Sequence, residues 1–126
     1  MKLTSVNSQL SVLILFLVFL GCDYRPESEL VSGHWKYNSV EKNAQPLFEI
    51  SDNDIMILQK DSLFEYHINS VNKHMFGKWS YSDHTIHLKY AEPDTTRHFT
   101  VDLLSDHLLK MHEGEVNFSF IRVKTD

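Results

Sequence analysis

Most of the chain beyond its N-terminal segment alternates between apolar and polar residues with a period of two. Between residues 62 and 69, Phe64 and Ile68 fall on one face together with the other apolar positions, and the polar residues fall on the opposite face. The same alternation recurs at 84–90 and 97–104. Because successive side chains of a strand point to opposite sides, this pattern predicts half-buried β-strands.

Residues that favour tight turns separate these apolar runs, as in Glu92-Pro93-Asp94 and Glu113-Gly114-Glu115. The predicted strands lie near residues 31–38, 46–50, 54–60, 62–69, 74–81, 84–90, 97–104 and 107–123, the last of these being a hairpin. Short turns favour antiparallel neighbours. One turn of helix could lie within residues 30–42, but no longer stretch after the N-terminal segment has a helical apolar stripe.

We therefore predict an all-β domain. About eight short antiparallel strands in up-and-down order can close into a small β-barrel, which hides the edges of the sheet and encloses room for packed side chains or one small ligand. A sandwich of two sheets is the alternative.

The N-terminal segment has a different pattern, an apolar run from Leu10 to Leu20 in which only Ser11 is polar. As a helix this run would rise about 16 Å, roughly half of the hydrocarbon core of a bilayer. Its length is typical of the apolar region of an export signal. We expect cleavage after Gly21, which would remove residues 1–21 and leave Cys22 at the new N-terminus.

Cys22 is the only cysteine in the chain. Its position behind the apolar run and Gly21, with Lys2 near the start, resembles the lipobox of bacterial lipoproteins, although Phe19 stands where Leu is usual. The resemblance implies acylation of Cys22, with palmitate among the acyl chains, and anchorage to a membrane of the bacterial cell envelope, the outer membrane rather than the inner one. An ordinary secretory signal and an uncleaved anchor are the alternatives.

The mature chain divides into two parts. Residues 22–29 are polar and include Pro26, which predicts a lipidated tether. Residues 30–126 contain no repeat and no second boundary, which predicts one domain. A single cysteine cannot form an internal disulfide, so this domain must be stabilised by its apolar core.

The charge of the chain argues against one class of partner. The formal net charge is −5, and removal of Lys2 with the signal makes it −6. Lysine and arginine residues form no cluster along the sequence. Because binding to nucleic acid requires a basic surface, we expect no nucleic-acid partner.

Four short motifs carry a family resemblance. They are Leu30-Val31-Ser32-Gly33-His34-Trp35, then Phe76-Gly77-Lys78-Trp79-Ser80-Tyr81, then Leu104-Ser105-Asp106, and finally Phe118-Ser119-Phe120-Ile121-Arg122. Together they resemble the bacterial lipocalin-like domain. The resemblance implies that Gly33, Trp35 and Arg122 are a structural signature, in which Trp35 closes one end of the barrel and Arg122 lies across its indole ring.

The same resemblance implies that the barrel interior binds a small apolar ligand. The candidate interior residues are seven aromatic side chains at inward positions and one glycine that would leave room beside them: Phe64, Tyr66, Gly77, Trp79, Tyr81, Phe99, Phe118 and Phe120. If these aromatic side chains fill the interior, the alternative is a protein-interaction or structural module with a protein partner. The stretch Glu41 to Asn53, with Pro46 and Phe48, is the candidate lid or contact surface.

The eight histidines do not predict a metal site. His87 follows His84 at the third position and His112 follows His107 at the fifth. Because both offsets are odd, each pair would point to opposite faces of a strand. His67, His87, His98 and His112 fall on the outward face, and His74 falls at the end of a strand. A surface pair of His87 with His98 is the alternative to solvated side chains. We expect no metal and no cofactor.

Catalysis finds little support in the sequence. No motif resembles a nucleophile elbow or a glycine-rich phosphate loop, and Glu65, Lys89 and Asp102 share the outward face instead of converging in a cleft. A hydrolase or isomerase at the barrel mouth is the least favoured of three hypotheses. We expect a binding protein and not an enzyme.

Overall fold

A computed structural model describes residues 26–124 of the chain. Cys22, the predicted cleavage site and the first part of the predicted tether lie outside these residues. The elements, in chain order, are α2 (Glu27–Val31), β1 (Gly33–Lys42), β2 (Gln45–Pro46), β3 (Ile55–Leu58), β4 (Leu63–Ile68), the 3-10 helix η1 (Asn69–Val71), β5 (Lys73–Ser82), β6 (Thr85–Tyr90), β7 (Thr96–Leu104), β8 (Leu108–Glu113) and β9 (Val116–Val123). Within this described part, no helix has the length and apolar character needed to cross a membrane.

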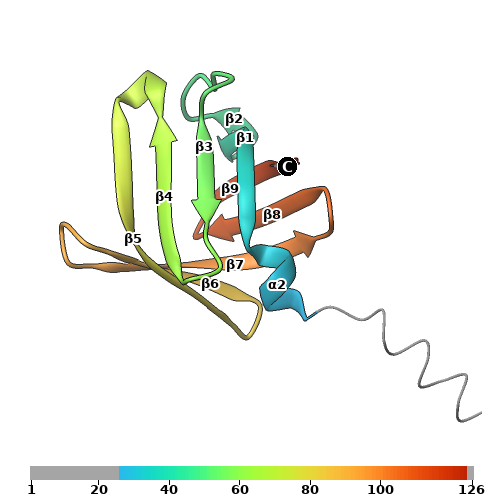
Figure 1. Ribbon diagram of the computed structural model, residues 1–126. Helices are drawn as coiled ribbons and strands as arrows, with labels where there is room; N and C mark the ends of the chain where they lie inside the picture. Colours follow the sequence, from blue (N-terminus) through green and yellow to red (C-terminus); the bar gives the residue numbers. More distant parts are fainter. Residues whose placement is uncertain (1–25, 125–126) are drawn as a thin grey trace, which may run out of the picture.

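The strands form one antiparallel sheet that closes on itself (Figure 1). From β3 to β9 each strand pairs with the next along the chain, β1 pairs with β3, and a further pairing of β1 with β9 completes the barrel. The two-residue strand β2 pairs only with the end of β1. The prediction of a small antiparallel barrel of about eight strands is confirmed, and the sandwich alternative is wrong.

Two details of the sequence prediction are wrong. The strand expected at 46–50 is limited to β2, because Pro46 offers no N–H to extend the ladder and the chain then turns so that Phe48 packs against the core. The alternation over 97–104 predicts that Leu103 points inward with Phe99 and Val101, but Leu103 is exposed. The register of β7 against β8 shifts between Val101 and Leu103 and moves the following side chain to the outer face.

The described structure begins with α2, at a position where we expected a tether. Pro26 precedes the first helical residue, which suits a helix start because proline has no N–H that would need a partner there. The helix occupies Glu27 to Val31, so it includes the last residues of the expected tether over 22–29. Its last residue, Val31, is fully buried, whereas residues 26–29 are exposed.

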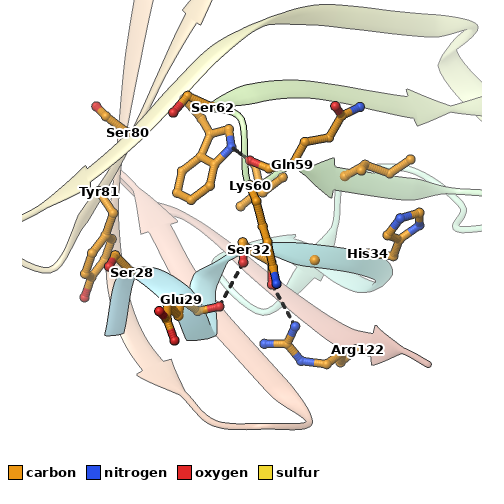
Figure 2. Close-up of a pocket in the computed structure, with 14 residues that line it drawn as sticks. Ser28, Glu29, Ser32, His34, Gln59, Lys60, Ser62, Ser80, Tyr81 and Arg122 are labelled. Carbon is orange, nitrogen blue, oxygen red and sulfur yellow. Dashed lines mark hydrogen bonds between the residues drawn. The ribbon is translucent and has the colours of Figure 1, made fainter. Parts of the chain in front are cut away.

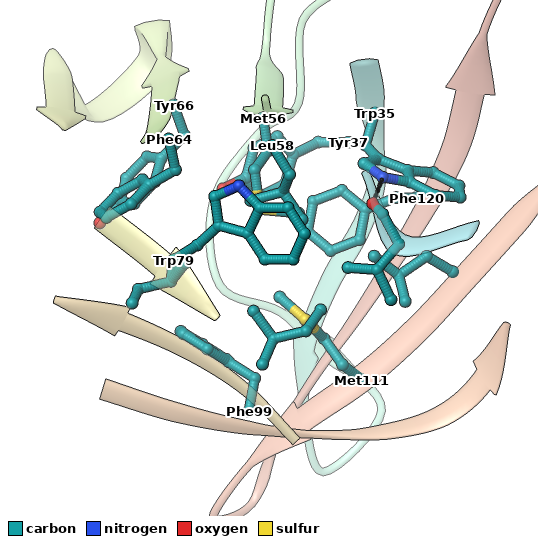
Figure 3. Close-up of a cluster of buried hydrophobic side chains, with 14 of the residues drawn as sticks. Trp35, Tyr37, Met56, Leu58, Phe64, Tyr66, Trp79, Phe99, Met111 and Phe120 are labelled. Carbon is teal, nitrogen blue, oxygen red and sulfur yellow. Dashed lines mark hydrogen bonds between the residues drawn. The ribbon is translucent and has the colours of Figure 1, made fainter. Parts of the chain in front are cut away.

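Inward side chains from strands all around the barrel form one buried apolar core (Figure 3). Trp35 and Phe120 are fully buried there, and the rings of Tyr37 and Phe120 have centroids 4.6 Å apart. Full burial of one large apolar side chain contributes about 1.5–3 kcal/mol. The inward alternation that the sequence predicts for β4 is confirmed, since Phe64, Tyr66 and Ile68 are all buried.

We call the α2 end of the barrel the closed end. The guanidinium carbon of Arg122 lies 4.2 Å from the centroid of the Trp35 ring, which is the contact that the family resemblance implies. Arg122 also donates hydrogen bonds to the carbonyl groups of Leu30, Ser32 and Asp106. Gly33 makes room for it, because a Cβ there would lie 2.4 Å from Arg122 Nη1, and its φ of +139° suits glycine alone.

Candidate functional site

A cavity of about 360 Å³ occupies the opposite end of the barrel, which we call the open end. Its wall is mostly aliphatic and aromatic, with a few polar side chains. The lining residues are Tyr37, Val40, Leu47, Phe48, Met56, Tyr66, Ile68, Val71, Lys73, Leu88, Arg97, Phe99, Met111, Val116 and Phe118. Pockets for small molecules typically have about 300–1,000 Å³ and this mixture of apolar wall and few polar groups.

Loops at the ends of the strands form the rim of this cavity. Leu47 and Phe48 come from the stretch between β2 and β3, and Val71 comes from η1. Leu47 is 49% exposed and Val71 is 50% exposed, so apolar side chains border the opening itself. The stretch that the sequence singled out as a lid or contact surface thus contributes two residues to the cavity wall.

Asp54 fixes the loop that carries this part of the rim. The carboxylate is buried and accepts hydrogen bonds from the N–H groups of Ser51 and Asn69 and from the hydroxyl of Ser51, at 2.8 to 2.9 Å. Burial by itself would raise the pKa of Asp54, but these hydrogen bonds outweigh it and the pKa is lowered. Because Asn69 begins η1, one ionised side chain ties both rim segments together.

A hydrogen-bonded network crosses the cavity wall. Arg97 donates from Nε to both carboxylate oxygens of Glu113, at 2.9 and 3.1 Å, and from Nη1 to the hydroxyl of Tyr90 at 3.2 Å. The hydroxyls of Tyr90 and Tyr66 lie 2.8 Å apart. Hydrogen bonding to Glu113 raises the pKa of Arg97, and burial raises the pKa values of Tyr66 and Tyr37. Among the polar groups that line the cavity, Arg97 is therefore a cation paired with Glu113, and Tyr37 and Tyr66 are un-ionised phenols, while exposed Lys73 at the start of β5 adds a second cation.

The structure brings only some of the predicted ligand-binding residues to this cavity. Tyr66, Phe99 and Phe118 line it, whereas Phe64 and Phe120 do not and are buried in the core. Inward direction alone does not decide whether a side chain lines the cavity, because an inward side chain can lie near either end of the barrel. Many of the lining residues that the sequence reasoning missed also occupy inward positions of the same alternating strands. The missed residues are Tyr37, Val40, Met56, Ile68, Val71, Lys73, Leu88, Arg97, Met111 and Val116.

Gly77 does not line the cavity. It borders a shallow hollow on the outer wall with Phe76 and Lys89. A Cβ at Gly77 would lie 2.0 Å from the Lys89 carbonyl oxygen and 2.9 Å from a ring carbon of Phe64. The missing side chain thus permits a close approach of β5 to β6, and it leaves no room for a ligand.

Trp79 and Tyr81 point to the closed end, where they line a second, more polar hollow between α2 and the β3–β4 turn (Figure 2). Trp79 Nε1 donates to the Gln59 carbonyl oxygen at 2.7 Å. Tyr81 donates to Glu27 of α2 at 2.5 Å, and burial together with this bond raises the pKa of Tyr81 to about 12. Trp79 therefore holds the β3–β4 turn and Tyr81 holds α2 against the closed end. Neither residue lines the open-end cavity.

The outward histidines form cross-strand contacts. His87 and His98 are directly opposite each other on β6 and β7, with their Nδ1 atoms 2.7 Å apart, at hydrogen-bond distance. His67 and His74 are opposite each other on β4 and β5, and their rings stack with centroids 3.8 Å apart. His74, which we expected at the end of a strand, is the second residue of β5.

Solved structures share this arrangement of strands. A lipocalin-like protein from Bacteroides uniformis ATCC 8492 matches with a TM-score of 0.61 and 17% sequence identity over 75% of this chain and 99% of that one. The domain has a lipocalin-like fold. An uncharacterized protein from Bacteroides eggerthii DSM 20697 also matches this lipocalin-like barrel, with a TM-score of 0.60 and 13% identity over 73% of this chain and 98% of that one. No protein-family model and no curated protein sequence matches the chain.

Proposed function

We propose that this protein is a lipoprotein of the bacterial cell envelope whose lipocalin-like barrel binds a small apolar molecule at its open end. The observation that carries the proposal is the cavity of about 360 Å³ at the end of the barrel opposite α2, whose wall is mostly apolar, unlike the more polar hollow at the closed end. A cavity of this kind stabilises an apolar guest by removing its surface from water, at about 25 cal/mol per Å².

The wall of the cavity favours binding over catalysis. Among the described residues that line it, none is a carboxylate, an imidazole or a thiol. Arg97 is engaged by Glu113, and the pKa values of Tyr37 and Tyr66 are raised, so these phenols stay protonated near neutral pH. A general acid or base with a pKa near neutrality is what such chemistry would require.

The position of α2 supports a particular orientation of an anchored protein. Pro26 precedes α2 at the closed end, and Cys22 lies four residues before it in the sequence, a span of at most about 14 Å in an extended chain. A lipid on Cys22 would hold the closed end near the membrane. The opposite end of the barrel, which holds the cavity, would then face away from the bilayer, towards aqueous surroundings. Figure 1 shows α2 at the other end.

The ligand proposal is tested with the protein purified from its host. Native mass spectrometry is expected to detect a co-purified small molecule, and titration with the apolar dye N-phenyl-1-naphthylamine is expected to saturate at one site. Val116→Trp places an indole at the mouth of the cavity and should weaken dye binding at least about tenfold. Ile121→Trp adds the same group to the exposed face of β9 and is the matched control. Bare protein together with unsaturable dye binding would refute the proposal.

The anchor is tested separately by Cys22→Ser. The substituted protein should leave the membrane fraction and lose incorporation of radiolabelled palmitate. Unchanged partitioning would refute lipidation and leave the ligand proposal intact.

A protein-interaction module remains the second candidate. Its supporting observation is a pair of apolar side chains on the outer wall, Leu63 and Phe76, which are 44% and 56% exposed. This candidate predicts that Phe76→Ser abolishes the function of the protein in its host while dye binding at the open end stays unchanged. Loss of function through Val116→Trp alone would favour the ligand-binding proposal.

A further inference from the structure

Three side chains gather on the outer wall of the barrel, away from the cavity. Glu65 and His67 are two residues apart on β4 and so share its outward face, since Tyr66 between them points to the interior. His74 on β5 is directly opposite His67 in the register of the two strands. This placement puts one carboxylate and two imidazoles together on two paired strands.

The ligand atoms of the three side chains have the spacing of a coordination site. Glu65 Oε2 lies 3.3 Å from His74 Nε2 and 3.6 Å from His67 Nε2, and all the potential ligand atoms lie within 4.8 Å of one another. Around a tetrahedral Zn²⁺ with bonds of about 2.0–2.1 Å, neighbouring ligand atoms are about 3.3 Å apart. Only small side-chain adjustments separate the described geometry from a metal-bound one.

The two imidazoles are already oriented alike. Their rings stack with centroids 3.8 Å apart and an interplanar angle of 21°, so that both Nε2 atoms approach the same carboxylate oxygen. Both residues lie within paired strands, which fixes their backbone positions. The side chains are 36% to 52% exposed, so an ion from solution can reach them without opening the fold.

We propose that Glu65, His67 and His74 bind a divalent transition-metal ion, with Zn²⁺ as the expected occupant. Two imidazole nitrogens and one carboxylate oxygen suit Zn²⁺, Ni²⁺ or Cu²⁺, whereas Mg²⁺ and Ca²⁺ prefer ligand sets made of oxygen alone. Three protein ligands leave the fourth tetrahedral position to water or to a ligand from another molecule. The site is independent of the cavity and of the proposed ligand.

The test is calorimetric titration of the full chain in detergent with zinc chloride, after treatment with chelator and with a purification tag that contains no histidine. The wild-type protein should bind one equivalent of Zn²⁺ with no comparable response to Mg²⁺. His67→Ala and His74→Ala should each weaken binding at least about tenfold, because each removes one of three ligands. His98→Ala is the matched control, since it disrupts the other cross-strand histidine pair, whose rings meet edge to face, and should leave the affinity unchanged.

A second measurement separates loss of a ligand from loss of structure. In the wild-type protein, Zn²⁺ should shift the imidazole NMR signals of His67 and His74 and leave those of His87 and His98 in place. Circular dichroism of the three variants should match that of the wild type, because all three side chains lie on the outer wall. The absence of zinc binding, or zinc binding that survives His74→Ala and is lost in His98→Ala, would overturn the proposal.

Discussion

The two ends of the barrel are built from similar residues for different purposes. At the closed end, Trp35 is fully buried, its Nε1 donates to the Val31 carbonyl oxygen at 2.8 Å, and Arg122 covers its ring. At the open end, Phe99 and Phe118 border a cavity instead of meeting a cover. Inward aromatic side chains of the same strands can therefore form a packed core at one end and the wall of a cavity at the other. The difference depends on whether a segment such as α2 covers that end of the barrel.

The largest expected difference lies between two phenylalanines on β9. Phe120 is fully buried and its ring contacts Tyr37, whereas Phe118, two residues earlier, borders the cavity. Phe120→Ala should lower the free energy of unfolding by about 3–5 kcal/mol, as buried Phe to Ala changes do. Phe118→Ala should cost about half as much or less and should change dye binding. Urea denaturation measures both, and equal losses would contradict the division into a packed end and an open end.

Arg122 tests the cover of the closed end. Arg122→Ala removes the contact with Trp35 and the hydrogen bonds to Leu30 and Ser32. We expect a loss of about 2 kcal/mol in the free energy of unfolding. Arg122→Lys keeps the positive charge but loses the planar guanidinium group and its several N–H donors. This substitution should therefore recover only a small part of the lost stability. Full recovery by lysine would show that charge alone is needed there.

Asp54 tests the rim of the open end. Asp54→Asn should lower the free energy of unfolding by about 1–3 kcal/mol at pH 7, because buried N–H donors lose a charged acceptor. The pKa of Asp54 is lowered on folding, so its contribution is present above the unfolded pKa of about 3.9 and is lost as pH falls through the lower folded value. The gap between wild type and variant should therefore close in acid.

The control for Asp54 is Asp52→Asn, a change to an exposed carboxylate that pairs with Lys36 on the surface. It should alter the free energy of unfolding by less than about 1 kcal/mol. A gap for Asp54→Asn that stays constant from pH 7 to pH 2 would contradict the role assigned to its ionised form.

The smallest expected change in stability concerns the rim side chain Leu47. Because Leu47 is 49% exposed, Leu47→Ser should shift the free energy of unfolding by no more than about 0.5 kcal/mol, and the same holds for Leu63→Ser on the outer wall. Only Leu47→Ser should weaken dye binding, since Leu47 lines the cavity. Equal effects of the two changes on dye affinity would place the binding site elsewhere.

The sequence was sufficient for most of the strands and most of the inward positions, because alternation is a local property. The sequence did not show how far along the barrel axis an inward side chain lies. Phe64 and Tyr66 both point inward from β4, yet only Tyr66 borders the cavity. Nor could the sequence show that His67 faces His74, since comparing spacings within one strand cannot detect a partner across a turn. That pairing depends on the register set by η1 and Asn72, which has a left-handed backbone conformation.

The pairing of β1 with both β3 and β9 has a consequence for behaviour at high local concentration. Each of the eight barrel strands in the described part of the chain has a hydrogen-bonded neighbour on both sides, and the short β2 contributes only two residues outside the ring. An unpaired strand edge is the template on which β-proteins join into extended aggregates. Copies of this domain at high concentration would therefore meet mainly through side chains, because none of the eight barrel strands of the described residues offers a whole free edge for joining sheets.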